Sequence, residues 1–249
     1  MYYSYLMFML PGLLLMLYAQ YKVKHSFSKY SQIMNMRGLT GADAAREVLR
    51  QNGVYDVRIE RVSGSLNDHY DPRTNVIRLS DSVYGSASVA AVGVAAHEAG
   101  HAVQYAQSYG PIKLRSAIIP ICNIGSQIGI PIAIVGAVLD FAGLVYVGIA
   151  LFAMAVFFQV VTLPVEFNAS RRAIQTINSA ALLSKEESAG ARAVLTAAAL
   201  TYVASMIQAV MTLLYYLTRL TDRRRCKDRQ KIYGKPSKIG CQSAHKGRL

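Results

Sequence analysis

Four long stretches of this sequence contain no charged side chain, and they restrict the fold more strongly than any other feature. These stretches cover residues 1–21, 116–139, 141–164 and 193–218. A helix of about 20 apolar residues is long enough to cross a lipid bilayer, so we expect four transmembrane helices. The second and third stretches meet at Asp140 and predict a helical hairpin. The chain is therefore predicted to be a mainly α-helical, polytopic membrane protein with the lipid bilayer as a partner.

Basic residues beside the first stretch predict how the chain is oriented in the cell membrane. Four lysine and arginine residues follow it between positions 22 and 37. Because loops rich in lysine and arginine stay on the cytoplasmic side, we expect the N-terminus to lie outside the cell. Residues 22–115 and residues 165–192 then lie in the cytoplasm, and so does any active site that they build.

The C-terminal residues 219–249 form a separate, strongly basic segment. They contain eleven lysine and arginine residues and two aspartates, so they account for +9 of the net charge of +13. We expect this segment to be disordered; it can bind anionic lipid headgroups or have no partner. After four crossings it would lie outside the cell, against the rule that orients the first stretch, so its side is left open. The rest of the chain has too little excess positive charge to predict a nucleic-acid partner.

Residues 37–86 are the part of the chain with the pattern of a soluble protein. Thr40 begins a sequence that resembles a capping box before a short amphipathic helix. Apolar and charged residues alternate at 57–60 and again at 76–80, as they do in half-buried strands. The turn-forming sequence HYDPRTN lies between these two segments. We expect a helix, a small antiparallel sheet and then a longer helix over about residues 86–108, which together form a small cytoplasmic α+β domain.

The sequence VAAHEAGHAVQ places two histidines and a glutamate in a run of small apolar residues. In a helix, His97 and His101 lie one turn apart on one face, and two imidazoles so placed can bind one zinc ion. Glu98 lies about 60° around the helix from His101, too far aside to be the natural third ligand. It can instead take a proton from zinc-bound water, which then attacks a peptide carbonyl. The motif predicts a zinc peptidase with two histidine ligands and Glu98 as the catalytic residue.

A catalytic zinc site needs a third protein ligand, and three residues are considered for this role. His69 lies upstream in a turn-rich segment. Asp140 lies at the far end of the predicted hairpin, across the membrane from the motif. Glu166 follows the hairpin, which returns the chain to the side of His101, so Glu166 is the preferred ligand. Its alternative role is that of a first-turn glutamate favoured by the helix dipole.

Several separated motifs occur in the order in which a known family has them. HEAGHA, an apolar hairpin and LPVEFNASRRA resemble the YugP-like membrane zinc metallopeptidases, as do YAQYKVKHSFSKYS, GLTGADAAREVL and DHYDPRTNVIRLS. The arrangement is also similar to the HtpX membrane proteases. The resemblance implies zinc bound by His97, His101 and Glu166, with Glu98 as the catalytic glutamate. In the HtpX-like pattern an aspartate stands four residues after the ligand glutamate, where this chain has Ser170, which cannot be a charged partner for a ligand histidine.

The residue that stabilises the oxyanion of a tetrahedral intermediate is left open among four candidates. These are His69, Tyr105, Arg171 and Tyr202. Each also has a structural alternative: a turn hydrogen bond for His69, helix packing for Tyr105, and anchoring at the membrane interface for the other two.

The hypothesis from the sequence is a membrane-embedded zinc-dependent endopeptidase. Peptides or damaged membrane proteins are the expected substrates, and this substrate class follows from the resemblance alone. The alternative is a non-catalytic membrane protein with a structural zinc site, which would not need Glu98. A transporter or channel is disfavoured because the uncharged stretches contain no ionisable residue of the kind that marks an ion pathway.

Overall fold

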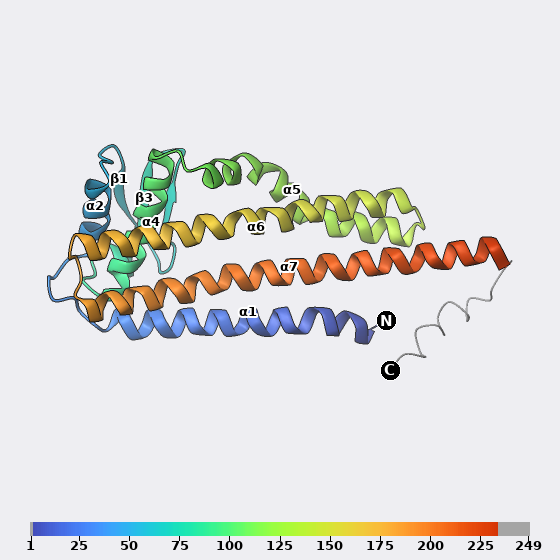
Figure 1. The fold of residues 1–249 in the computed structure, drawn as a ribbon, viewed down its shortest axis with the longest axis horizontal. Helices are drawn as coiled ribbons and strands as arrows, with labels where there is room; N and C mark the ends of the chain where they lie inside the picture. Colours follow the sequence, from blue (N-terminus) through green and yellow to red (C-terminus); the bar gives the residue numbers. More distant parts are fainter. Residues whose placement is uncertain (1, 234–249) are drawn as a thin grey trace.

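Four long helices dominate the structure, as the uncharged stretches predict. The computed structural model describes the backbone of residues 2–233 and the side chains of residues 5–221. Its long helices are α1 (Tyr2–Ser31), α5 (Gly110–Val138), α6 (Ala142–Ser179) and α7 (Lys185–Tyr233). All four contain segments long and apolar enough to cross a membrane, and they run side by side along the molecule (Figure 1). The prediction of a mainly α-helical chain with four candidate spans is confirmed.

The helices are longer than the uncharged stretches that predicted them. Helix α1 continues past residue 21 to Ser31, and α6 runs without a break from the hairpin into the segment that carries Glu166. Helix α7 continues into the basic C-terminal segment as far as Tyr233. Residues 234–249 lie outside the described residues. Charges mark where a helix leaves an apolar environment, but lysine, arginine and glutamate are good helix formers and do not end it.

Helices α5 and α6 form the predicted hairpin, and glycines bring their backbones close together. Asp140 lies in the turn between them with a φ of 52°, a conformation that aspartate adopts more readily than most residues. A Cβ atom added at Gly129 would stand 2.9 Å from the carbonyl oxygen of Gly148, so the two helices approach closely only because these positions lack side chains. The hairpin brings the chain back along α6 to Glu166.

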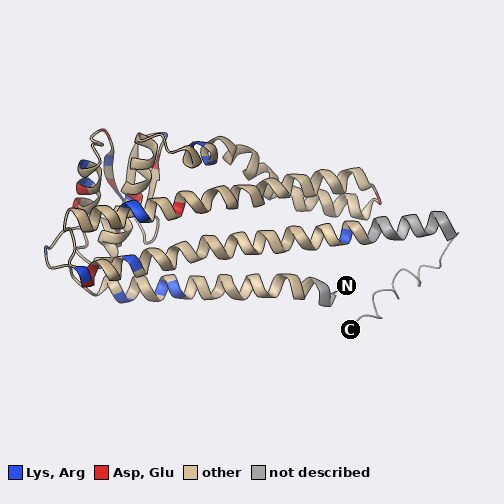
Figure 2. Cartoon of the chain, viewed as in Figure 1, with Lys and Arg blue, Asp and Glu red and all other residues tan. Residues whose placement is uncertain are grey.

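A small domain lies at one end of the long helices, opposite the N-terminus and the α5–α6 turn (Figure 1). In chain order it contains α2 (Gly41–Gln51), β1 (Arg58–Val62), β2 (His69–Asp71), β3 (Val76–Ser80), α3 (Asp81–Tyr84) and α4 (Val89–Ala106). Charged side chains gather at this end, whereas the middle of the long helices carries almost none among the described residues (Figure 2). The boundary of the apolar environment therefore lies close to the small domain.

The sheet is mixed, with the strand order β1–β3–β2, so the prediction of an antiparallel sheet from the two alternating segments was wrong. Strand β1 is parallel to β3, and β2 is antiparallel to it. The reason is that the sequence HYD is itself a strand and pairs with β3 through a tight turn. In this turn the Thr74 hydroxyl and the Arg73 N–H donate hydrogen bonds to Asp71, and they lower the pKa of Asp71 to about 2. Strand β1 pairs with the other side of β3.

Helix α4 is the centre of the domain, because it packs against α2, α6, α7 and the sheet. It begins after Ser88, whose hydroxyl accepts a hydrogen bond from the Ala91 N–H. A Cβ atom added at Gly100 would stand 2.7 Å from the carbonyl oxygen of Ala169 in α6. The backbones of α4 and α6 therefore touch beside His101, and this contact sets how close α6 comes to the histidine motif.

We predict that Gly100→Ala destabilises the protein by about 1–3 kcal/mol, because the added methyl group overpacks the contact between α4 and α6. The matched control is Gly85→Ala, since no atom lies within 4 Å of a Cβ added there. Thermal unfolding of the detergent-solubilised variants measures the difference. If Gly100→Ala unfolds at the same temperature as its control, the two helices do not approach as closely as described.

Candidate metal centre

Three potential metal ligands meet between helix α4 and helix α6. His97 and His101 lie one turn apart on α4, and their rings contact edge to face with centroids 4.7 Å apart. Glu166 lies on α6 and is only 2% exposed. The donor atoms of the three side chains all lie within 4.8 Å of one another. The fold thus brings together the three residues that the sequence singles out as potential ligands.

The distances between the donor atoms fit a zinc ion. Oε2 of Glu166 lies 3.3 Å from Nε2 of His97 and 3.5 Å from Nε2 of His101. Zinc binds imidazole nitrogen and carboxylate oxygen at about 2.0–2.2 Å, so two such ligands of a tetrahedral ion lie roughly 3.3–3.6 Å apart. Two histidines and one glutamate are also a donor set of catalytic zinc sites, in which the fourth position stays open.

Gln104 fixes the orientation and the tautomer of His101. Its Nε2 donates hydrogen bonds to the carbonyl oxygen of Val165 at 2.8 Å and to Oδ1 of Asn168 at 3.0 Å. Its Oε1 lies 3.1 Å from Nδ1 of His101, and an amide oxygen can only accept. Nδ1 of His101 therefore carries the proton, and in the neutral ring Nε2 presents its lone pair toward Glu166.

Ser170 has the corresponding position beside His97. Its hydroxyl oxygen lies 3.1 Å from Nδ1 of His97. The serine hydroxyl can accept a hydrogen bond from Nδ1–H or donate one to Nδ1, and either bond holds the ring. Because a hydroxyl carries no charge, it orients His97 by hydrogen bonding alone.

The three donor atoms form an arrangement that is unfavourable unless a cation is present. The Nε2 atoms of two imidazoles and one carboxylate oxygen face a common centre, and Oε2 of Glu166 is buried without a well-formed hydrogen bond. Burial lowers the pKa of His101, but the neighbouring Glu166 and Glu98 carboxylates outweigh burial and raise it overall. A proton and a metal ion can each relieve this repulsion.

Arg115, for which the sequence gives no sign of a role, contacts the other oxygen of Glu166. Its Nη1 lies 3.3 Å from Oε1 of Glu166, and its Nε is buried without a hydrogen-bond partner. The ion pair directs one carboxylate oxygen to Arg115 and leaves Oε2 for the two histidines. In the sequence, Arg115 stands directly before the uncharged stretch 116–139 and resembles any basic residue that flanks a membrane span.

Glu98 lies beside the three potential ligands and is not one of them. Its Oε2 accepts a hydrogen bond of 3.0 Å from the backbone N–H of Tyr70 in β2. Glu98, His97 and Glu166 line one cavity of about 180 Å³. Burial raises the pKa of Tyr70 to about 12, so its hydroxyl keeps the proton that it donates to Asn75, and this bond helps to hold β2 beside the cavity.

The other two residues considered as third ligands do not belong to this donor group. His69 is exposed, and its Nδ1 lies 2.8 Å from the carbonyl oxygen of Asn67. Asp140 is in the α5–α6 turn, at the opposite end of the long helices (Figure 1). Of the three residues considered, only Glu166 meets the two histidines.

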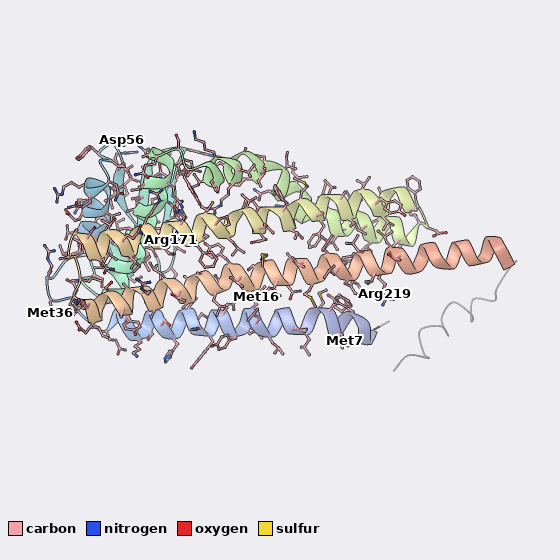
Figure 3. All side chains as sticks on the ribbon, viewed as in Figure 1. Met7, Met16, Met36, Asp56, Arg171 and Arg219 are labelled. Atoms are coloured by element: carbon pink, nitrogen blue, oxygen red, sulfur yellow. The ribbon has the colours of Figure 1, made fainter. Side chains whose placement is uncertain are left out.

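Of the four residues considered for oxyanion stabilisation, Tyr202 of α7 lines the cavity. The other three do not line it. The Tyr105 hydroxyl is instead hydrogen-bonded to Ser116. Arg171, which is labelled in Figure 3, lines a separate polar hollow. Asn52, which follows α2, and several other residues of α6 line the same hollow. Tyr202 therefore remains as the candidate for the oxyanion.

Comparison with known proteins gives a family and a relative. The model of a family described as "Putative neutral zinc metallopeptidase" matches residues 5–221. Over 200 residues the chain is 48% identical to a Bacillus subtilis (strain 168) protein named "Putative membrane protease YugP", and the match covers 80% of this chain and 89% of the relative. No solved structure matches the chain. The part matched by the family includes Glu98, the three potential ligands and all four candidate spans.

We predict that Glu166→Ala strongly lowers the zinc content of the purified protein. The loss should exceed the 10–100-fold drop in affinity that is typical when only a partner of a ligand is removed. The matched control is Glu186→Ala, which removes an exposed glutamate at the start of α7. Atomic absorption after dialysis against a weak chelator gives the zinc content. A Glu166→Ala protein with full zinc content would mean that another residue is the third ligand.

Proposed function

We propose, because the chain belongs to the neutral zinc metallopeptidase family, that it is a membrane-embedded zinc-dependent endopeptidase. In this proposal His97, His101 and Glu166 hold the metal and Glu98 is the catalytic base. One observation carries the proposal: three donor atoms converge on one centre, and a further carboxylate lines the same cavity beside them.

The chain's own residues supply the proton transfers and the orientation. Zinc, when bound at the three ligands, lowers the pKa of water and polarises the peptide carbonyl. Glu98 accepts a proton from the attacking water and returns it to the leaving nitrogen. The Tyr70 N–H holds one oxygen of Glu98, which leaves the second oxygen for the water. The Tyr202 hydroxyl is suited to donate a hydrogen bond to the oxyanion, because Tyr202 lines the cavity together with Glu98.

An extended peptide is the substrate form that the domain supports. Strand β2 lies at the edge of the sheet and pairs only with β3. Because the Tyr70 N–H bonds to Glu98, the unpaired side of β2 faces the catalytic residue. A peptide that adds to this edge as a further strand lies beside Glu98, which already accepts the Tyr70 N–H. This pairing favours peptides and unfolded segments of membrane proteins over folded domains.

A structural zinc site is the alternative, and two features disfavour it. Structural zinc sites have four protein ligands and no open position, whereas here three donors adjoin a cavity. A structural site also gains nothing from Glu98, whose carboxylate is held next to the ligands by the Tyr70 N–H.

We predict that Glu98→Gln keeps its zinc but hydrolyses a casein-type substrate about 10²–10⁴-fold more slowly, because the variant lacks the proton acceptor and not a ligand. The control is Glu186→Gln, at an exposed site on α7. Zinc content and hydrolysis are measured on the same preparations in detergent. Hydrolysis by Glu98→Gln at a rate close to that of the control would rule out the proposed base.

We also propose that the small domain faces the cytoplasm. Lysine and arginine residues gather at the domain end of the long helices (Figure 2), and the α5–α6 turn carries Asp140 and no basic residue. The basic residues from Arg219 on belong to the opposite end of α7 and count against this orientation. The positive-inside rule favours this orientation.

Cysteine labelling tests the orientation with a pair of positions. In a background without the three native cysteines, Gln51→Cys places a thiol at an exposed position at the end of α2, and Leu139→Cys places one at the α5–α6 turn, where Leu139 is 67% exposed. With a membrane-impermeant reagent, we expect intact cells to be labelled at position 139 only and lysed cells at both. Labelling at position 51 in intact cells would place the domain outside.

A further inference from the structure

The cavity beside the candidate metal centre has a second, apolar wall. Its polar wall carries His97, Glu98 and Glu166. The apolar wall is built by two of the long helices, α1 and α7, from Val23, Phe27, Val194, Leu195, Ala198 and Ala199. The four residues of α7 and Tyr202 are spaced so that they share one face of the helix.

Neither metal binding nor the proton transfers of Glu98 need this apolar wall. The cavity holds about 180 Å³. A water molecule takes up about 30 Å³ of liquid, and a protein cavity of about 150 Å³ is known to hold one benzene-sized group. The space therefore accommodates the reacting groups and one medium-sized side chain, and it is too small for more. An apolar wall of this size matches a single apolar side chain, because burying such a group in it removes apolar surface from water.

Leu66 contributes to the rim of the same cavity in an unusual conformation. It lies in the loop between β1 and β2, has a φ of 59° and is 50% exposed. A positive φ is unfavourable for a leucine, and such residues are concentrated at functional sites. The loop is held by Asp68, whose carboxylate accepts hydrogen bonds from the N–H and the hydroxyl of Ser80. An exposed apolar side chain is thus kept at the entrance of an apolar pocket.

The apolar wall lies where the long helices enter the charged end of the molecule. On α1, Val23 and Phe27 are interleaved with Lys22, Lys24 and Lys29. Lysines beside a membrane span lie at the level of the lipid headgroups. The pocket is therefore at the height of the membrane surface, where an unfolded membrane-protein segment exposes apolar residues.

We propose that this apolar wall is the specificity pocket of the peptidase and binds one side chain next to the bond that is cleaved. Its size selects leucine- to phenylalanine-sized side chains, and Ala198 and Ala199 keep the space open. The substrates are extended segments that carry an apolar residue at the membrane surface. This inference rests on the proposed function, and it is tested by ligand binding as well as by hydrolysis.

The test uses two zinc-directed hydroxamates that differ only in one side chain, isobutyl or methyl. Their affinities for the zinc-loaded full-length protein in detergent are measured by calorimetry, without any catalytic turnover. One methylene in an apolar pocket is worth about tenfold or more in discrimination, so we expect the isobutyl compound to bind at least about tenfold more tightly. Ala198→Leu fills the pocket and should abolish this preference. Thr196→Leu, at an exposed position of the same helix, should retain it.

A second variant, Leu195→Ala, keeps the test valid if Ala198→Leu misfolds. It enlarges the pocket and should shift the preference toward a bulkier benzyl hydroxamate. Equal affinities of the two compounds for the unsubstituted protein, or an unchanged preference in Ala198→Leu with full zinc content, would overturn the pocket. Failure of the unsubstituted protein to bind either compound would overturn it as well. Side-chain preference without any peptide hydrolysis would leave the pocket standing and refute the proposed function instead.

Discussion

The approach of one carboxylate oxygen to two imidazole nitrogens, between Glu166 of α6 and the histidines of α4, is the interaction on which the rest of the site depends. The carboxylate belongs to the α5–α6 hairpin and the imidazoles to the small domain, so the centre exists only when the two are docked. The backbone contact of Gly100 with Ala169 sets their separation. Gln104 bridges the same interface by bonding both to His101 and to the Val165 carbonyl. Docking of the hairpin and formation of the metal centre are therefore one event.

A buried carboxylate is costly unless positive charge surrounds it, and this requirement explains the environment of Glu166. Arg115 at the start of α5 faces one of its oxygens, and the metal centre faces the other. The long helices thus do more than provide candidate membrane spans. Helix α6 provides the carboxylate, α5 its counter-charge, and α1 and α7 the apolar side of the cavity. A metal ion that binds only the docked form also stabilises that form.

The parts of the site that follow local geometry could be predicted from the sequence, and the parts created by tertiary packing could not. His97 and His101 share a helix face because of their spacing, and Glu166 returns to them because a hairpin comes back to the side it left. Gln104 and Arg115 gave no signal, since a glutamine in a helix and an arginine beside a span occur in many structural roles. The mixed sheet was missed because the three residues of β2 look like part of a turn. The uncharged stretches did not predict the ends of α1, α6 and α7, because a charged residue marks the end of an apolar segment and not the end of a helix.

A zinc ion held by two imidazoles and one carboxylate, with one position open to water, is the central claim. X-ray absorption at the zinc edge of the purified protein in detergent tests it most directly. We expect four nitrogen or oxygen neighbours at about 2.0–2.2 Å, together with the outer-shell scattering of two imidazole rings. A sulfur neighbour at about 2.3 Å, or the scattering of three or more imidazole rings, would contradict the claim, because the donor group of His97, His101 and Glu166 contains neither.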